Sequence, residues 1–230
     1  MVSYISGRVL GNDFWYKTLP VLIIGMIIWV INTLLFSGFL GLSAIPLSIT
    51  FIVISVILYI ILWILTIILA FMKKNWLSMI TFFISSIFTG IISSSILIWA
   101  AAIIALDLVL GIFFAAFFIG LGATIGLLLI GLFLRDRISQ RWIYPLLLFG
   151  FLLIGLEFSL ILLFGYNPFI LITSILVLIW FFAVVLYDGS RLPNTIEEGY
   201  WMVAVIDIFL DMVNIIIRIF IIIVEIFSES

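Results

Sequence analysis

The residues of this chain that could do chemistry lie near its C-terminal end, where carboxylates interrupt apolar runs. One run carries two acids, an amide and a base, namely Asp207, Asp211, Asn214 and Arg218. On a helix these positions share one face, because they are spaced at i, i+4, i+7 and i+11. A charge inside a bilayer costs at least about 2.5–3.5 kcal/mol, so such residues usually face a bundle interior, pair with one another or line an ion path. This stripe is therefore the first candidate for a functional site.

Asp207 and Asp211 are one helical turn apart, and like charges at that spacing repel each other. Where the dielectric constant is low, both carboxyl groups are not ionised at once unless a cation lies nearby, so the two titrate as a coupled set. Arg218 lies about 10 Å beyond Asp211 along the helix axis, so any partner of Arg218 is expected on a neighbouring helix. We expect Asp211 to be buried near mid-helix. Asp207 has two open interpretations, as a member of the same site or as a residue wetted by solvent.

Two more acids lie in apolar surroundings. Asp188 closes the run that precedes the stripe, and Glu157 is an isolated carboxylate inside another run. Asp188 is either a residue at a helix end or a partner of the stripe, and its neighbours in space decide which. Glu157 either forms a structural ion pair or belongs to the same polar path. Asp107 and Glu225 lie near the ends of their runs, and we expect them to be solvated.

The composition places the chain in lipid. Of its 230 residues, 67% are hydrophobic and 9% are charged, which is more apolar surface than a soluble domain of this size can cover. The net charge of -2 gives no sign of nucleic acid as a partner. The chain has no Cys and no His, so it lacks a thiol nucleophile, the commonest metal ligand and the usual group that titrates near neutral pH. We expect a membrane protein that is not an enzyme and whose proton chemistry depends on carboxylates.

Seven apolar segments are each long enough to cross a bilayer, which takes about 20 residues of helix. They cover residues 19–40, 47–72, 76–100, 108–134, 143–164, 168–187 and 200–227. The connections are short, and Gly41, Ser43 and Pro46 mark the first turn. The predicted fold is an all-α membrane protein, a bundle of seven transmembrane helices over residues 18–228. It follows an N-terminal cytoplasmic arm of residues 1–17.

The basic residues outside these segments all fall on one side of the arrangement. They precede the first segment or lie in every second connection: Arg8, Lys17, Lys73, Lys74, Arg135, Arg137, Arg141 and Arg191. The other connections, near Gly41, Ala105 and Tyr166, carry no Lys or Arg. Cytoplasmic loops are enriched in these residues, which predicts a cytoplasmic N-terminus and a C-terminus outside. If the last segment instead re-enters the membrane, the C-terminus returns to the cytoplasm.

Two patterns concern packing. Trp76, Trp142 and Trp201 lie at predicted helix ends, where indole rings anchor a helix at the membrane surface. The fourth segment carries small residues at spacings that let helices approach closely: Gly111, Ala115, Ala116, Gly120, Gly122 and Gly126. We expect helix packing there, with a pore lining as the alternative.

Two C-terminal stretches resemble a known family. The first is Tyr187-Asp188-Gly189-Ser190-Arg191, and the second runs from Ile206 to Asn214 and contains both acids of the stripe. Together they are similar to the signature of the transmembrane Bax inhibitor motif (TMBIM) family, a Tyr-Asp-Thr-Gln-Arg-like stretch followed by a Leu-Tyr-Leu-Asp-x-x-Asn-like helix. Residues 88–93 resemble a Gly segment in the third helix of that family, and the seven-segment layout agrees over nearly the whole chain. Gly189 and Ser190 replace the family's Thr-Gln, and Asp207 is an additional carboxylate.

The resemblance implies a pH-sensitive calcium leak. Two aspartates on the last two helices would share a proton and gate a cytosolic path, and the matching residues here are Asp188 and Asp211, with Asn214 beside them. Paired carboxylates also supply the oxygen ligands that Ca²⁺ prefers, so these two are the candidate metal ligands. The partners implied are the lipid bilayer, calcium ions and protons. The predicted ion-binding and proton-binding residues are Asp188, Asp211, Asp207 and Asn214, and the candidate charge partners are Arg218, Arg191 and Glu157.

Other functions stay open. A proton-coupled transporter of small solutes would use the same carboxylates, but transporters often contain repeats and helices broken by Gly or Pro. We find no repeat and expect no proline inside a helix. A non-conducting regulatory membrane protein would tolerate neutralisation of Asp211. An intramembrane aspartyl protease needs Gly-x-Gly before its second aspartate, where this chain has Ile208-Phe209-Leu210, and a later Pro-Ala-Leu, whereas the last proline is Pro193. The expected location is the plasma membrane in a prokaryote, or an endomembrane such as the endoplasmic reticulum in a eukaryote.

Overall fold

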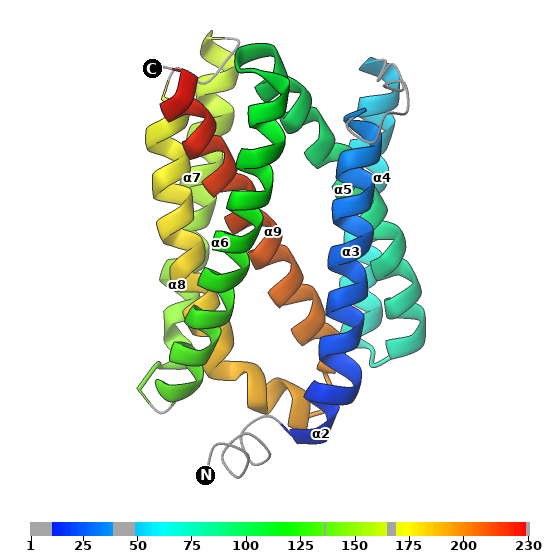
Figure 1. Ribbon diagram of the computed structural model, residues 1–230. Coiled ribbons are helices and arrows are strands. Elements are labelled where there is room, and N and C mark those ends of the chain that lie inside the picture. Colours follow the sequence, from blue (N-terminus) through cyan, green and yellow to red (C-terminus); the bar gives the residue numbers. More distant parts are fainter. Residues whose placement is uncertain (1–10, 39–48, 136, 165–168, 229–230) are drawn as a thin grey trace. The chain divides into compact units, whose positions relative to one another are not determined.

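The computed structural model describes residues 11–38, 49–135, 137–164 and 169–228, and within these ranges the regular structure is helical, with no strand (Figure 1). The described part of the chain begins with α2 (Gly11–Asp13) and a π-helical turn, η1 (Phe14–Thr18), which lead into α3 (Leu19–Phe36). The other long helices are α4 (Ile49–Phe71), α5 (Asn75–Ile103), α6 (Leu106–Phe133), α7 (Ile143–Phe164), α8 (Ile170–Glu197) and α9 (Trp201–Ser228). A 3-10 turn, η2 (Gln140–Trp142), precedes α7. The all-α prediction is confirmed for these ranges.

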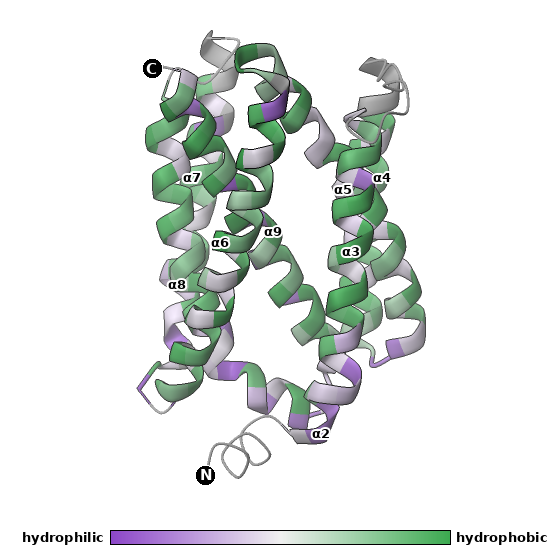
Figure 2. Ribbon diagram, in the orientation of Figure 1, coloured by the Kyte–Doolittle hydropathy of each residue, from purple (hydrophilic) through white to green (hydrophobic). Residues whose placement is uncertain are grey.

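The helices have the length and composition that a bilayer requires. Five stretches are long and apolar enough to cross one: Gly11–Phe36, Val53–Phe71, Asn75–Ile103, Asp107–Phe133 and Ile170–Glu197. Figure 2 shows hydrophobic residues along the middle of the long helices and hydrophilic residues mainly near helix ends. α9 is outside this set, since Asp207, Asp211 and Arg218 fall within about three of its turns. A lipid environment follows, whereas seven crossings and the side of the N-terminus stay predictions.

The sixth helix differs most from the prediction. It was expected to end at Tyr187, but α8 continues to Glu197 and includes Arg191 and Pro193. The expectation of proline-free helix interiors is therefore wrong. The sequence Asp-Gly-Ser-Arg-Leu-Pro has the composition of a loop, yet Leu192 and Ile196 are buried one helical turn apart, and this packing continues the helix.

The N-terminal part also differs. Residues 11–17, which belong to the predicted arm of residues 1–17, are helical. The first ten residues of that arm, the predicted turn around Gly41, Ser43 and Pro46, and the connection near Tyr166 lie outside the described residues.

The chain forms two compact units that are not continuous in sequence. Unit 1 runs to Leu110 and also contains Pro193–Phe209, while unit 2 consists of Gly111–Leu192 and the chain from Leu210 onward. Helices α8 and α9 therefore each contribute to both units.

In unit 1, α5 packs against α3 and α4 through hydroxyl groups and one glycine. The indole of Trp29 donates a hydrogen bond to Ser93 Oγ at 3.0 Å, and that of Trp63 donates to Thr89 Oγ1 at 3.3 Å. A Cβ atom at Gly90 would lie 2.8 Å from the carbonyl oxygen of Trp29, so only glycine permits this approach of α5 to α3.

Lys73 holds two connections together at one end of unit 1. Lys73, in the turn between α4 and α5, donates from Nζ to the carbonyl oxygen of Glu198 at 2.8 Å. The same ammonium lies 4.4 Å from the centre of the Tyr200 ring, a cation–π distance. The α4–α5 and α8–α9 connections therefore lie together, as the distribution of basic residues predicts.

In unit 2, glycines set the helix crossings. α6 meets α8 where Gly131 lies against the carbonyl oxygen of Leu186 and Gly189 lies against Leu128. The predicted packing role is confirmed for Gly120, which lies against Ile216 of α9, whereas added Cβ atoms at Gly111, Gly122 and Gly126 would meet nothing within 4 Å. Among the glycines of α6, the closest contact is at Gly131, which is outside the predicted set.

Candidate functional site

Asp188 and Asp211 are brought together in unit 2. Asp188 comes from α8 and Asp211 from α9, and Asp211 acts on Asp188 at hydrogen-bonding range. Two carboxylates have no hydrogen to donate, so a hydrogen bond between them requires that one carboxyl group carries a proton. Asp211 is only 5% exposed, as expected from its position in the middle of an apolar run. We call these two residues the aspartate pair.

The backbone of α6 positions the α8 side of the pair. Gly189 directly follows Asp188, and a Cβ atom at Gly189 would lie 2.6 Å from the carbonyl oxygen of Leu128. On the other side of Asp188, Tyr187 is buried, and its carbonyl oxygen accepts a hydrogen bond from Ser190 Oγ at 2.6 Å. The helix turn that carries Asp188 is therefore held by close backbone contact.

Arg191 is the positively charged residue that acts on Asp188. It lies one turn beyond Asp188 on α8 and acts on it electrostatically. The guanidinium lies 5.2 Å from the centre of the Tyr187 ring and donates from Nη1 to the Tyr187 hydroxyl at 3.3 Å. Of the three predicted charge partners, Arg191 is thus the one that the structure places beside Asp188.

Arg218 and Glu157 pair with each other instead. Arg218 of α9 donates to both carboxylate oxygens of Glu157 on α7, at 2.6 and 2.8 Å. A longer bond of 3.4 Å runs from Arg218 to Ser174 Oγ on α8. The expectation that a neighbouring helix supplies the partner of Arg218 is confirmed, and of the two interpretations of Glu157 the structural ion pair is the one observed.

The other two residues of the stripe, Asn214 and Asp207, lie on the same helix. Asn214 donates from Nδ2 to the carbonyl oxygen of Leu210 at 2.7 Å, a bond within its own helix. Asp207 is half-buried and belongs to unit 1, whereas Asp211 belongs to unit 2. Helical spacing correctly placed the four residues along α9, but their partners are distributed over different helices.

The aspartate pair can attract a cation but cannot enclose one alone. Calcium takes about six to eight oxygen ligands, and two carboxylates supply at most about four. Within the described ranges, no cluster of three or more acidic residues is present. An ion at the pair would therefore keep much of its water, which suits an ion in transit better than one held permanently.

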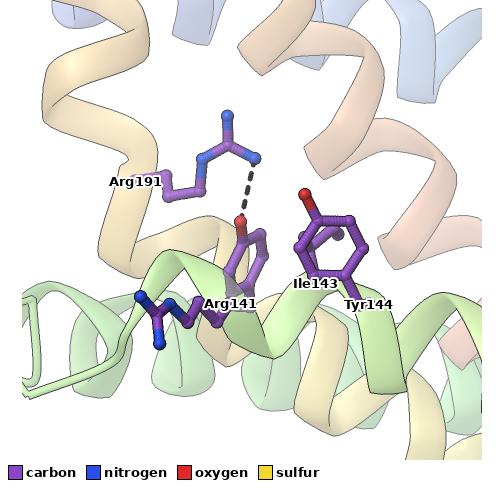
Figure 3. Close-up of a pocket in the computed structure, with 5 residues that line it drawn as sticks. Arg141, Ile143, Tyr144 and Arg191 are labelled. Carbon is purple, nitrogen blue, oxygen red and sulfur yellow. Dashed lines mark hydrogen bonds between the residues drawn. The ribbon is translucent and has the colours of Figure 1, made fainter.

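A second polar group was not singled out by the sequence. Arg141, Tyr144, Tyr187 and Arg191 line a cavity of about 330 Å³ in unit 2, together with Ile143 (Figure 3). In the sequence analysis, Arg141 indicated only on which side of the membrane its connection is expected to lie. Its place in the same lining as Arg191 depends on how the start of α7 meets α8, and no spacing along the chain carries that information.

Comparison with known proteins adds no identity. No family model, curated protein or solved structure matches this chain. The TMBIM resemblance therefore stays a prediction that rests on the residues quoted for it.

Proposed function

We propose that this protein is a pH-sensitive cation leak whose expected ion is Ca²⁺ and whose gate is the aspartate pair. The observation that supports the proposal is that Asp211 of α9 acts on Asp188 of α8 at hydrogen-bonding range, with both residues in unit 2. A single proton shared between the two carboxyl groups would join the two helices. The TMBIM resemblance supports the choice of Ca²⁺.

The gate works through the charge of the pair. With one proton present, the carboxyl groups hold α8 and α9 together by their hydrogen bond. When that proton leaves, two carboxylates face each other at low dielectric and repel strongly. Their repulsion favours separation of the two helices, and the doubled negative charge attracts a divalent cation into the opened path.

The groups that act on Asp188 come from its own helix and from α9. Arg191 lies on the same helix as Asp188 and acts on it electrostatically. From α6, the contacts next to Asp188 come from Leu128 and Gly131, which carry no charge.

The test is calcium flux into proteoliposomes at pH 6, 7 and 8, with the wild type and the Asp188→Asn/Asp211→Asn variant. Flux that changes with pH in the wild type and is insensitive to pH in the variant supports the gate. Flux no greater than that of empty liposomes at every pH would overturn conduction and favour a regulatory role. Replacing Ca²⁺ by K⁺ in the same assay measures the selectivity.

Pro193 favours a second candidate, a proton-coupled transporter. It lies inside α8, one turn and a half beyond Asp188, and cannot donate the backbone hydrogen bond that would continue the helix ladder. Broken helices near a titrating carboxylate are a feature of transporters. A proton-coupled transporter moves its solute only together with protons, in the same or the opposite direction, so a pH-sensitive dye inside the liposomes distinguishes it. Proton movement that depends on an added solute would support transport, and calcium flux without proton movement would support the leak.

A further inference from the structure

Helix α9 is buried on every side except one. From residue 203 to residue 221, the half-buried residues recur every three or four positions, and all the others are buried. Residues at this spacing share one face of a helix. They are Val203, Asp207, Leu210, Asn214, Ile217 and Arg218, and we call them the accessible face of α9. The face runs about 22 Å along the helix axis, most of the roughly 30 Å thickness of a hydrocarbon core.

The polarity of α9 is arranged as in a helix that faces water. Half of the residues on the accessible face are polar, and two of these are ionisable. Among the buried residues from 203 to 221, Asp211 is the only polar one. Apolar residues inside and polar residues outside are the pattern of a helix on the surface of a soluble protein.

Helix α4 shows the opposite pattern and indicates what a lipid-facing helix of this protein looks like. Over Val53–Phe71 its exposed side chains are apolar, with Ile57 51% and Ile61 55% exposed, while the hydroxyl residues Ser55 and Thr66 are buried. Polar and charged groups are costly in hydrocarbon, so they avoid that side of a helix. The polar residues on the accessible face of α9 therefore favour water rather than lipid as their surroundings.

The two ends of the accessible face differ. At one end the face begins three residues after Tyr200, at the α8–α9 connection, where Glu198 is exposed. At the other end, Arg218 donates from two nitrogens to Glu157, and Ile221, the next residue on the same face, is 7% exposed. Water can therefore enter from the connection, and the ion pair closes the far end.

Asp211 lies at the edge of the accessible face. It is one helical turn from both Asp207 and Asn214, and it directly follows Leu210. Asp211 itself is buried, so water on the face would reach its carboxyl group from one side only. A carboxylate on the way to a site raises the local concentration of cations. Asp207 has that position, and it is the carboxylate that the TMBIM pattern does not contain.

From these observations we infer that the accessible face of α9 is a water-filled approach to the aspartate pair. It is entered at the α8–α9 connection, and Asp207 attracts cations into it. The role of an approach rests on the proposed leak. The presence of water along α9 does not, because it can be measured without any flux.

The test uses single cysteines in the full-length protein, which has no cysteine of its own, and a small hydrophilic methanethiosulfonate. We expect Leu210→Cys and Asn214→Cys to react in proteoliposomes, because the reactive thiolate forms where water reaches the thiol. Ile208→Cys and Ile215→Cys are the matched controls on the buried side of the same turns and should react at least tenfold more slowly. Ile57→Cys should also be slow, because it is exposed to lipid.

A second measurement tests the part played by Asp207. Cationic and anionic methanethiosulfonates of equal size are compared at Leu210→Cys, which lies one turn from Asp207. The cationic reagent should react faster, and Asp207→Asn should lower the ratio of the two rates roughly fivefold. Glu225→Gln is the matched control, since it removes a carboxylate from the same helix beyond the ion pair, and it should leave the ratio unchanged. An unchanged ratio in Asp207→Asn would overturn the assignment of Asp207.

Three results would overturn the approach itself. The first is a reaction of Ile208→Cys as fast as that of Leu210→Cys, and the second is labelling of Leu210→Cys and Asn214→Cys only by a membrane-soluble maleimide. The third is a reaction from the side of the membrane opposite to that of Lys74→Cys. Labelling of the face without calcium flux would support the water and overturn the leak, whereas flux through a protein whose face does not react would place the ion path elsewhere.

Discussion

Glu157 on α7 and Arg218 on α9 are joined by two nearly parallel bonds of 2.6 and 2.8 Å, and both side chains are about four-fifths buried. In a membrane-embedded bundle neither charge has water to replace its partner. The pair therefore links two helices that are far apart in sequence, and it keeps Arg218 away from the role of charge partner to the aspartates.

Removing one member of this ion pair should destabilise the protein strongly. Glu157→Gln leaves the arginine without a counter-charge and is expected to lower the free energy of unfolding by about 3 kcal/mol. Glu157→Gln/Arg218→Gln should cost less than the two single variants added together, because no lone charge remains. Thermal unfolding in detergent measures all four proteins. Losses that simply add would show that the two residues do not act as a pair.

Neutralising one aspartate should remove the pH dependence of flux. If the proposed gate operates, rising pH removes the shared proton from the pair in the wild type, the carboxylates repel, and calcium flux should increase. In Asp211→Asn the amide cannot lose a proton in this range, so flux between pH 6 and 8 should be constant. Asp107→Asn, in the first turn of α6, is the control and should keep the wild-type slope. If both variants behave alike, the gate has been assigned to the wrong residues.

Two glycines of α6 should respond oppositely to alanine. At Gly131 the new methyl group would collide with the carbonyl oxygen of Leu186, and overpacking of this kind costs roughly 1–3 kcal/mol. At Gly122 it would meet nothing within 4 Å, and the better helix propensity of alanine should raise stability by up to about 1 kcal/mol. The unfolding temperatures of the two variants give the comparison. Similar shifts would mean that the α6–α8 crossing is looser than the structure shows.

The absence of cysteine makes the topology directly measurable. Single cysteines at Lys74 and Glu197 should react from the same side of the membrane with an impermeant thiol reagent, because Lys73 ties their connections together at 2.8 Å. A cysteine at Ala105 should react only from the other side. Labelling of Lys74→Cys and Ala105→Cys from one side would contradict the predicted crossing of α5.

Hydropathy was enough to predict the helices but not their partners. An apolar run of about 20 residues forms a helix in lipid whatever surrounds it, since its backbone groups must bond internally. The partner of Arg218 depends instead on which helices pack together, and Glu157 lies 61 positions away. The pairing of Asp188 with Asp211 was predicted from the TMBIM resemblance. Helical spacing alone relates Asp211 only to its neighbours on α9.

The sequence-based prediction was wrong where the local composition favours one structure and packing against neighbouring helices favours another. Asp188 to Pro193 has the residues of a loop, but burial of its neighbours extends α8 through it. Gly122 and Gly131 are the same residue type on the same helix, and only the neighbouring helix distinguishes the one that matters. Such differences arise from three-dimensional contacts, which a single sequence does not contain.

The discontinuous make-up of unit 1 constrains the order in which the protein is built. Phe209 is fully buried in that unit, 5.7 Å from the ring of Trp63 and 5.1 Å from that of Phe82. During synthesis α4 and α5 leave the ribosome long before α9, so these two rings await their neighbour while all of Gly111–Leu192 is translated. Unit 1 becomes complete in sequence only when Phe209 has been added, and unit 2 only with the residues that follow it. A chain that stops before α9 therefore lacks the last segment of both units.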